Sequence, residues 1–170
     1  MIKGYSLVFT CFILLIACQP ETKAPSAYPN QVGDISFDSK VDDPNFKICN
    51  SDRVLQYYHF GKGLQYKGEK SKINELFKDG YKNTERQGET GFVTIRFIVN
   101  CEGKTGWYRI QAMDKAYKAR EFNEKLVDEL LELTKKLDGW VIGVDHQNRV
   151  DYYQYLTFKL TNGQLIEIMP

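Results

Sequence analysis

The chain has 170 residues, with 23 Lys and Arg and 22 Asp and Glu, so the formal net charge is +1. This balance argues against nucleic acid or an anionic membrane surface as the main partner, because both attract proteins with a basic excess. The length fits one domain with a tail.

The first residues have the pattern of a secretory signal. A single early cation, Lys3, precedes the apolar run Leu7–Ala17, which ends in Leu15-Ile16-Ala17-Cys18. The run is too short for an uncleaved anchor, because a helix needs about 20 apolar residues to span a bilayer. Cleavage without lipidation is a second alternative.

A small residue followed by cysteine resembles the lipobox of bacterial lipoproteins. The resemblance implies that Cys18 becomes the mature N-terminus and carries diacylglycerol and an acyl chain. Removal of Met1–Ala17 takes away Lys3 and leaves 22 basic against 22 acidic side chains. Because Gln19 rather than Asp follows the cysteine, enterobacterial-type sorting favours the outer membrane. We expect an exported protein that is lipid-anchored to the outer membrane, on its periplasmic face.

Residues 18–45 have the composition of an extended tether, with four prolines and few apolar side chains. Ile35–Phe37 is a weak apolar patch that could dock somewhere. The domain itself is expected at residues 46–170. Cys49 and Cys101 are either bridged, as an oxidising compartment allows, or two separate buried thiols. A metal site is not expected, because the sequence has no C-x-x-C and His59 and His146 stand alone.

The first half of the domain predicts a helix and a hairpin. Val54–Phe60 is aromatic and fits either a strand or an irregular lead-in. Ser71 is a candidate cap for a helix through Ile73–Tyr81. Gly91–Asn100 and Thr105–Ala112 both alternate between apolar and polar side chains and are separated by a tight turn at Glu102-Gly103, which predicts an antiparallel hairpin.

The second half predicts a long helix and two more strands. From Asn123 onward a stripe of leucines has helical spacing: Leu126, Leu130, Leu133 and Leu137. Gly139 ends this helix, Trp140 follows, and residues 141–149 are expected to form a polar loop. Tyr152–Leu160 and Gln164–Met169 are expected strands joined by Asn162-Gly163. The pattern predicts an α+β two-layer sandwich, with an antiparallel three- to four-stranded sheet packed on the one long helix.

In this order and spacing the domain resembles the C-terminal domain of TonB-like proteins of Bacteroidetes-type bacteria. The resemblance runs through Phe60-Gly61-Lys62-Gly63, the helix Ile73–Tyr81, Gly91–Asn100, Glu102-Gly103-Lys104, the helix Lys125–Leu137, Trp140 and Leu156–Leu160. It implies a fold whose last core strand can pair with a short receptor segment by strand addition. The chain departs from a TonB energy transducer in its lipobox, its short tether, Val141 after Trp140, and the extra strand Gln164–Met169.

We expect a lipid-anchored binding module of the cell envelope, which holds an unidentified protein or peptide by strand addition or through aromatic side chains. The candidate contact residues are Tyr57, Tyr58, Trp107, Tyr152, Tyr153 and Tyr155. Aromatic residues in strands more often pack on the sheet itself. The alternative function is an accessory to TonB-dependent outer-membrane uptake. Neither enzymatic activity nor a cofactor is expected, and exposed edge strands could let the chain self-associate.

Overall fold

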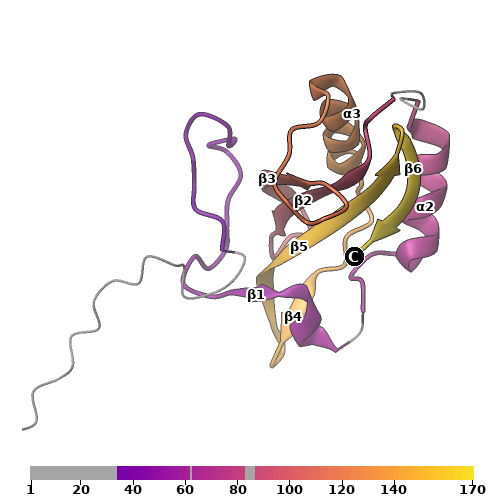
Figure 1. The fold of residues 1–170 in the computed structure, drawn as a ribbon. Helices are drawn as coiled ribbons and strands as arrows, with labels where there is room; N and C mark the ends of the chain where they lie inside the picture. The colour runs from indigo at the N-terminus through magenta and orange to yellow at the C-terminus, as the bar shows by residue number, and fades with distance from the viewer. Residues whose placement is uncertain (1–33, 62, 83–86) are drawn as a thin grey trace, which may run out of the picture. The chain divides into compact units, whose positions relative to one another are not determined.

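The computed structural model describes residues 34–61, 63–82 and 87–170, which form an α+β domain of two helices and a six-stranded mixed sheet (Figure 1). A 3-10 helical turn spans Tyr57–Phe60. The helices are α2 (Glu69–Gly80) and α3 (Glu124–Lys135), and the strands are β1 (Val54–Gln56), β2 (Gly91–Val99), β3 (Thr105–Met113), β4 (Gly143–Asp145), β5 (Asn148–Thr161) and β6 (Gln164–Met169). Neither helix is long and apolar enough to cross a membrane.

Strand β5 is the centre of the sheet and pairs with four other strands. β2 lies antiparallel along one edge of β5, and β3 continues the sheet beyond β2. β1 pairs in parallel and β6 antiparallel along the opposite edge, while β4 forms a hairpin with the beginning of β5. The prediction of a three- to four-stranded antiparallel sheet was therefore wrong, because two three-residue strands, β1 and β4, complete a mixed sheet.

The predicted hairpin is confirmed as β2 and β3. The four alternating apolar residues of β2 are fully buried: Val93, Ile95, Phe97 and Val99. A register shift lies between Arg96 and Ile98, and opposite it Trp107 of β3 has a φ of 54°. Such a bulge gives β3 a local bend at Trp107.

Both helices cover the same core. The prediction of a sheet packed on one long helix was therefore wrong, because α2 and α3 form the helical layer together. Ile73 and Phe77 of α2 are buried in one cluster with Leu126 and Leu130 of α3. Helix α2 begins two residues before Ser71, because Gly68 takes the N-cap position with a φ of 82° that suits glycine. α3 begins after Asn123, as predicted.

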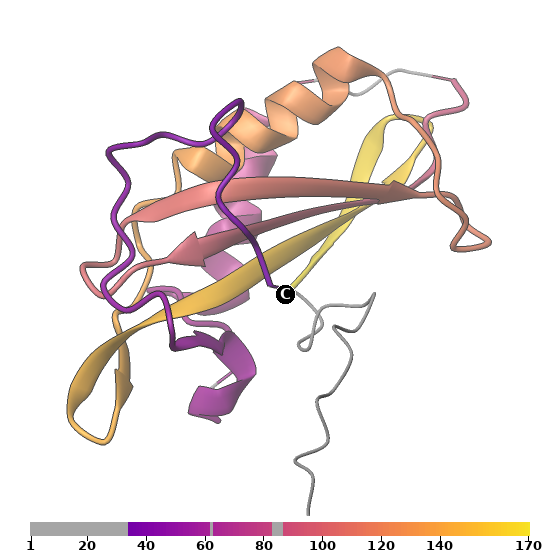
Figure 2. The same ribbon diagram turned by 90° about the vertical axis from the view of Figure 1, so that its left-hand side faces the viewer.

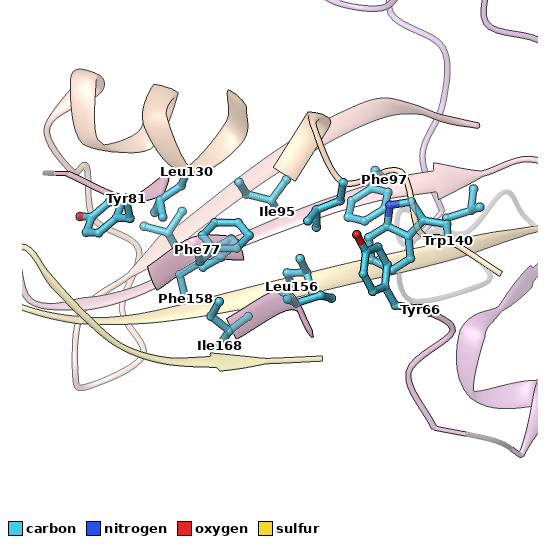
Figure 3. Close-up of a cluster of buried hydrophobic side chains, with 14 of the residues drawn as sticks. Tyr66, Phe77, Tyr81, Ile95, Phe97, Leu130, Trp140, Leu156, Phe158 and Ile168 are labelled. Carbon is cyan, nitrogen blue, oxygen red and sulfur yellow. The ribbon is translucent and has the colours of Figure 1, made fainter. Parts of the chain in front are cut away.

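Trp140 closes the core between α3 and the sheet, as its position after the helix predicted. Its side chain is 4% exposed. Its ring meets Tyr66 at 4.9 Å and Phe97 at 5.1 Å between centroids, both edge to face (Figure 3). The packing therefore joins the segment before α2, strand β2 and the segment after α3.

The expected polar loop at residues 141–149 is instead the β4–β5 hairpin. His146 and Gln147 form its turn with φ values of 45° and 70°. Two consecutive positive φ angles are typical of a type I′ turn, which usually contains Asn or Gly. The sequence lacks that signal here, so the hairpin was missed.

Residues 34–46, which we call the N-terminal strap, lie on the face of the sheet opposite the two helices (Figures 1 and 2). Ile35 is buried against Ile98 and Tyr153. Phe37 and Phe46 contact the ring of Trp107 at 5.5 and 6.4 Å between centroids. The part of the predicted tether that the structure describes therefore packs on the sheet, and the apolar patch Ile35–Phe37 accounts for this contact.

An ion pair fastens the strap to β3. Both carboxylate oxygens of Asp42 accept hydrogen bonds from the Arg109 guanidinium, at 2.7 and 2.6 Å. Arg109 also donates to the carbonyl oxygen of Ser36 at 2.6 Å. The Asp42 side chain is only 1% exposed. The hydrogen bond from Arg109 lowers the pKa of Asp42 below its ordinary 3.8.

Arg109→Ala should lower the free energy of unfolding at pH 7 by about 2–4 kcal/mol, because it leaves a buried carboxylate without its cation. Since the folded-state pKa of Asp42 is lowered, the pair stabilises the fold above pH 3.8 and loses that effect as the pH falls through the lower folded value. The difference between wild type and variant should therefore shrink below about pH 3.8. Urea titrations followed by circular dichroism at pH 7 and pH 3 measure it.

Arg53→Ala is the matched control, because Arg53 pairs with Asp145 while its own side chain is 51% exposed. An exposed pair contributes about 0–1 kcal/mol. Equal losses in the two variants at pH 7 would contradict a fastening role for Asp42 and Arg109.

Candidate functional site

Two of the predicted contact tyrosines are buried, which corrects their assignment to a binding surface. Tyr152 is 0% exposed, and its hydroxyl donates to the carbonyl oxygen of Val141 at 2.8 Å. Burial raises the pKa of Tyr152. Tyr153 points to the opposite face, where Ile35 of the strap covers it. Both side chains hold the fold together instead of contacting a partner.

Trp107 is also covered by the strap. It packs between Phe37 and Phe46, and its indole nitrogen is buried without a hydrogen-bond partner among the described residues. The outer face of the sheet at this end is thus occupied by the chain's own N-terminal segment. The apolar patch Ile35–Phe37 was the one sequence signal of this contact, since residues 18–45 as a whole have the composition of a tether.

Tyr57, Tyr58 and Tyr155 remain as a smaller aromatic group. The rings of Tyr57 and Tyr155 meet edge to face at 5.2 Å, and Tyr58 contacts Tyr57 at 5.6 Å. Burial and the hydroxyl of Tyr155 raise the pKa of Tyr57 to about 12. Tyr58 is the most exposed of the three. Tyr57 also packs against the core and Tyr58 against the ring of His59, and none of the three lines the groove described below.

Of the two alternatives for Cys49 and Cys101, the structure has the bridge. The buried carboxylate of Asp151 lies beside it and accepts from the backbone amides of Asn50 at 2.7 Å and Cys101 at 2.8 Å. The two cysteines and Asp151 are the one cluster of metal-ligand types among the described residues. Because its sulfurs are bonded to each other and its carboxylate oxygens are hydrogen-bonded, this cluster serves as a structural junction. Cys18 lies outside the described residues.

A groove lies between α2 and β6. Its volume is about 510 Å³. The lining consists of Lys70, Asn74, Phe77, Lys78 and Tyr81 from α2 and its C-terminal end, and of Gln164, Leu165, Ile166, Glu167 and Ile168 from β6. The floor is apolar and continuous with the core, since Phe77 and Ile168 are buried. The rim carries the lysines, the amides and Glu167.

Two contacts define the ends of the groove. At one end the hydroxyl of Tyr81 donates to the carbonyl oxygen of Gly163 at 2.7 Å. At the other end the ammonium of Lys70 lies 3.3 Å from a carboxylate oxygen of Glu167. Helix and strand therefore run side by side in opposite directions, as Figure 1 shows.

The outer edge of β6 has no strand partner among the described residues. β6 pairs with β5 along its inner edge, from Thr161 and Gln164 to Thr157 and Met169. Ile166 is 54% exposed on this strand. An unpaired edge presents backbone N–H and C=O groups that another extended segment can satisfy. The groove can thus bind a peptide by its main chain and by its side chains.

A second hollow, of about 520 Å³, lies between residues 41–46 of the strap and β3. The strap itself forms one wall of it. Lys135 on its rim is already paired with Glu132 at 2.9 Å. β3, which forms the other wall, is also an edge strand, but the strap already covers its face here, so the α2–β6 groove is the stronger candidate.

Comparisons with known proteins leave the family open. No family model, curated protein or solved structure matches the chain. The resemblance to TonB C-terminal domains therefore rests on the sequence pattern, and the groove is interpreted from its own geometry.

The sequence predicted both walls of the groove but not the groove. Gln164–Met169 was expected to be a strand that fills the edge of β5, and it does pair there. The signal that was missed is that an added edge strand has an outer edge of its own. The four-residue spacing of Lys70, Asn74 and Lys78 also marks one polar row of α2.

Proposed function

We propose that this chain is a lipid-anchored, non-catalytic binding module of the cell envelope, which holds an extended segment of a partner protein against β6. The observation that carries the proposal is the unpaired outer edge of β6 beside a groove with an apolar floor. Strand addition uses main-chain hydrogen bonds for affinity and side-chain pockets for selectivity. The groove offers both.

The proposed location rests on the first residues of the chain. The signal pattern ending in Ala17-Cys18 supports export and lipidation at Cys18, and we propose the outer membrane, on its periplasmic face. The disulfide between Cys49 and Cys101 agrees with an oxidising compartment. The lipid would hold the module at the membrane, and the groove would hold the partner.

We also propose that the fold is related to the TonB C-terminal domain, with a displaced binding edge. In that family the last core strand receives the partner segment. Here the equivalent edge of β5 is already paired with β6 at five positions. A partner strand would therefore add to β6, one strand further out. This shift supports a binding module over direct transfer of energy-coupling function.

Site-specific cross-linking in the source bacterium tests the function. Ile166 is replaced by a photo-crosslinking benzoylphenylalanine, and adducts are mapped to the residue by mass spectrometry. Val144, at 56% exposure, is the matched control, because it is as exposed as Ile166 but lies on the distant β4–β5 hairpin. We expect an adduct to one defined partner segment from position 166 and none from position 144.

The same adduct should disappear from the membrane fraction when Cys18 is replaced by serine. An identical set of adducts from both positions would contradict binding at β6. Adducts to an outer-membrane receptor or to its energising motor would indicate that the chain is instead an accessory to TonB-dependent uptake.

A further inference from the structure

Three groove residues of α2 form one row beside the free strand edge. Lys70, Asn74 and Lys78 follow each other at intervals of four residues, and all three line the groove. Residues at this spacing lie on the same face of a helix. The row therefore runs along the groove from the Lys70–Glu167 contact toward the Tyr81–Gly163 contact.

The spacing of this row matches that of an extended chain. A helix rises 1.5 Å per residue, so residues four apart are separated by about 6 Å along its axis. Side chains on one face of a strand repeat every two residues, or about 6.7 Å. Over three positions the two repeats differ by less than about 2 Å, which flexible lysines can absorb. A strand beside β6 would thus present alternate side chains to Lys70, Asn74 and Lys78.

The row carries positive charge that carboxylates of this chain neutralise only in part. Among the described residues, the side chains of Lys78 and Asn74 have no hydrogen-bond or ion-pair partner. Lys70 pairs with Glu167, but both side chains are more than 40% exposed, so this pair exchanges readily with another carboxylate. Of the other carboxylates on α2, Glu75 is paired with Lys72, and none lines the groove.

We propose that the partner of this groove is an acidic strand: an extended segment with Asp or Glu at the two alternate positions that face Lys70 and Lys78, and a polar residue between them opposite Asn74. The inference rests on the proposed function and specifies the chemistry of its partner. The residues between the acidic positions point away from α2, and β-branched side chains there favour the extended conformation.

A second copy of this chain is a poorer occupant. Pairing of two β6 edges about a twofold axis would bring a second row of lysines to the same edge. Like charges that face each other across paired strands are destabilising. An acidic segment has the opposite effect.

Three synthetic peptides test the inference on the mature soluble chain, with Cys18 replaced by serine. Each is a fluorescent, capped peptide with the centre X-Val-Thr-Val-X, in which X is Glu, Gln or Lys. At 50 mM salt we expect the Glu peptide to bind about tenfold more tightly than the Gln peptide, which corresponds to two surface ion pairs. The advantage should fall at 500 mM salt, because exposed charges are screened.

The Lys78→Glu variant should lose the preference for the Glu peptide and gain one for the Lys peptide. Lys125→Glu is the matched control: it makes the same charge change at an exposed lysine of α3, away from the groove, and should leave the preference intact. Circular dichroism before titration confirms that both variants fold.

Equal affinity for the three peptides would overturn the acidic partner and leave strand binding at β6 standing. Failure of all three to bind, together with no adduct from position 166 in cells, would overturn the proposed function as well. A concentration-dependent dimer in sedimentation that is cross-linked through position 166 would place a second copy in the groove and overturn the acidic strand.

Discussion

Replacing both Cys49 and Cys101 by serine should lower the free energy of unfolding by about 4 kcal/mol. The bridge joins residues 52 positions apart, and a loop of this length restricts the unfolded chain by about that amount. The folded junction should survive, because Asp151 still accepts from the amides of Asn50 and Cys101. Urea titration of the mature soluble chain measures the loss, which corresponds to a fall in Tm of roughly 8–16 °C.

The wild type in the presence of a reducing agent is the control, since it should reproduce the stability of the double variant. A loss below about 1 kcal/mol in both samples would contradict a stabilising bridge. A count of free thiols in the unfolded, unreduced wild type establishes separately that the bond is formed.

Trp140→Ala should cost about 3–5 kcal/mol, the range for removing a fully buried large aromatic side chain. The indole fills the space between Tyr66 and Phe97 and is 4% exposed, so alanine would leave a cavity that these rings cannot close. Thermal and urea unfolding followed by circular dichroism measure the change.

Trp140→Phe separates packing from hydrogen bonding. The indole nitrogen is buried without a hydrogen-bond partner among the described residues, so phenylalanine removes an unsatisfied donor while it keeps a ring. We expect a loss below about 1.5 kcal/mol. An alanine variant as stable as the phenylalanine variant would contradict the placement of Trp140 in the core.

The sequence predicted those elements whose signals are local. The β2–β3 hairpin follows from alternation and a glycine turn, and α3 follows from its leucine stripe. β1 has three residues and pairs in parallel with β5, from Val54 and Asp151 to Gln56 and Tyr153. A strand of that length has no detectable period, so only its distant partner could have identified it.

The candidate site was harder to predict because its parts are far apart in the chain. Lys70 and Glu167, which meet at one end of the groove, are 97 residues apart. Tyr152 and Tyr153 illustrate the limit in another way. Neighbouring residues of a strand face opposite sides, so the two could not share one surface. Which of the two faces is open depends on the strap, whose apolar patch Ile35–Phe37 indicates a contact but not where it forms.

The strap and the disulfide together determine how this domain would respond to a pull on its N-terminal side. Tension applied at Asp34 would load buried Ile35 and the Ser36–Arg109 hydrogen bond first, then the Asp42–Arg109 pair, and would peel the strap from the sheet. The 15 residues from Asp34 to Ile48 would then span up to about 50 Å. At Cys49 the peeling stops, because the load passes through a covalent bond into the β2–β3 turn at Cys101. Under force the segment before Cys49 would therefore extend while β5, β6 and the groove keep their shape.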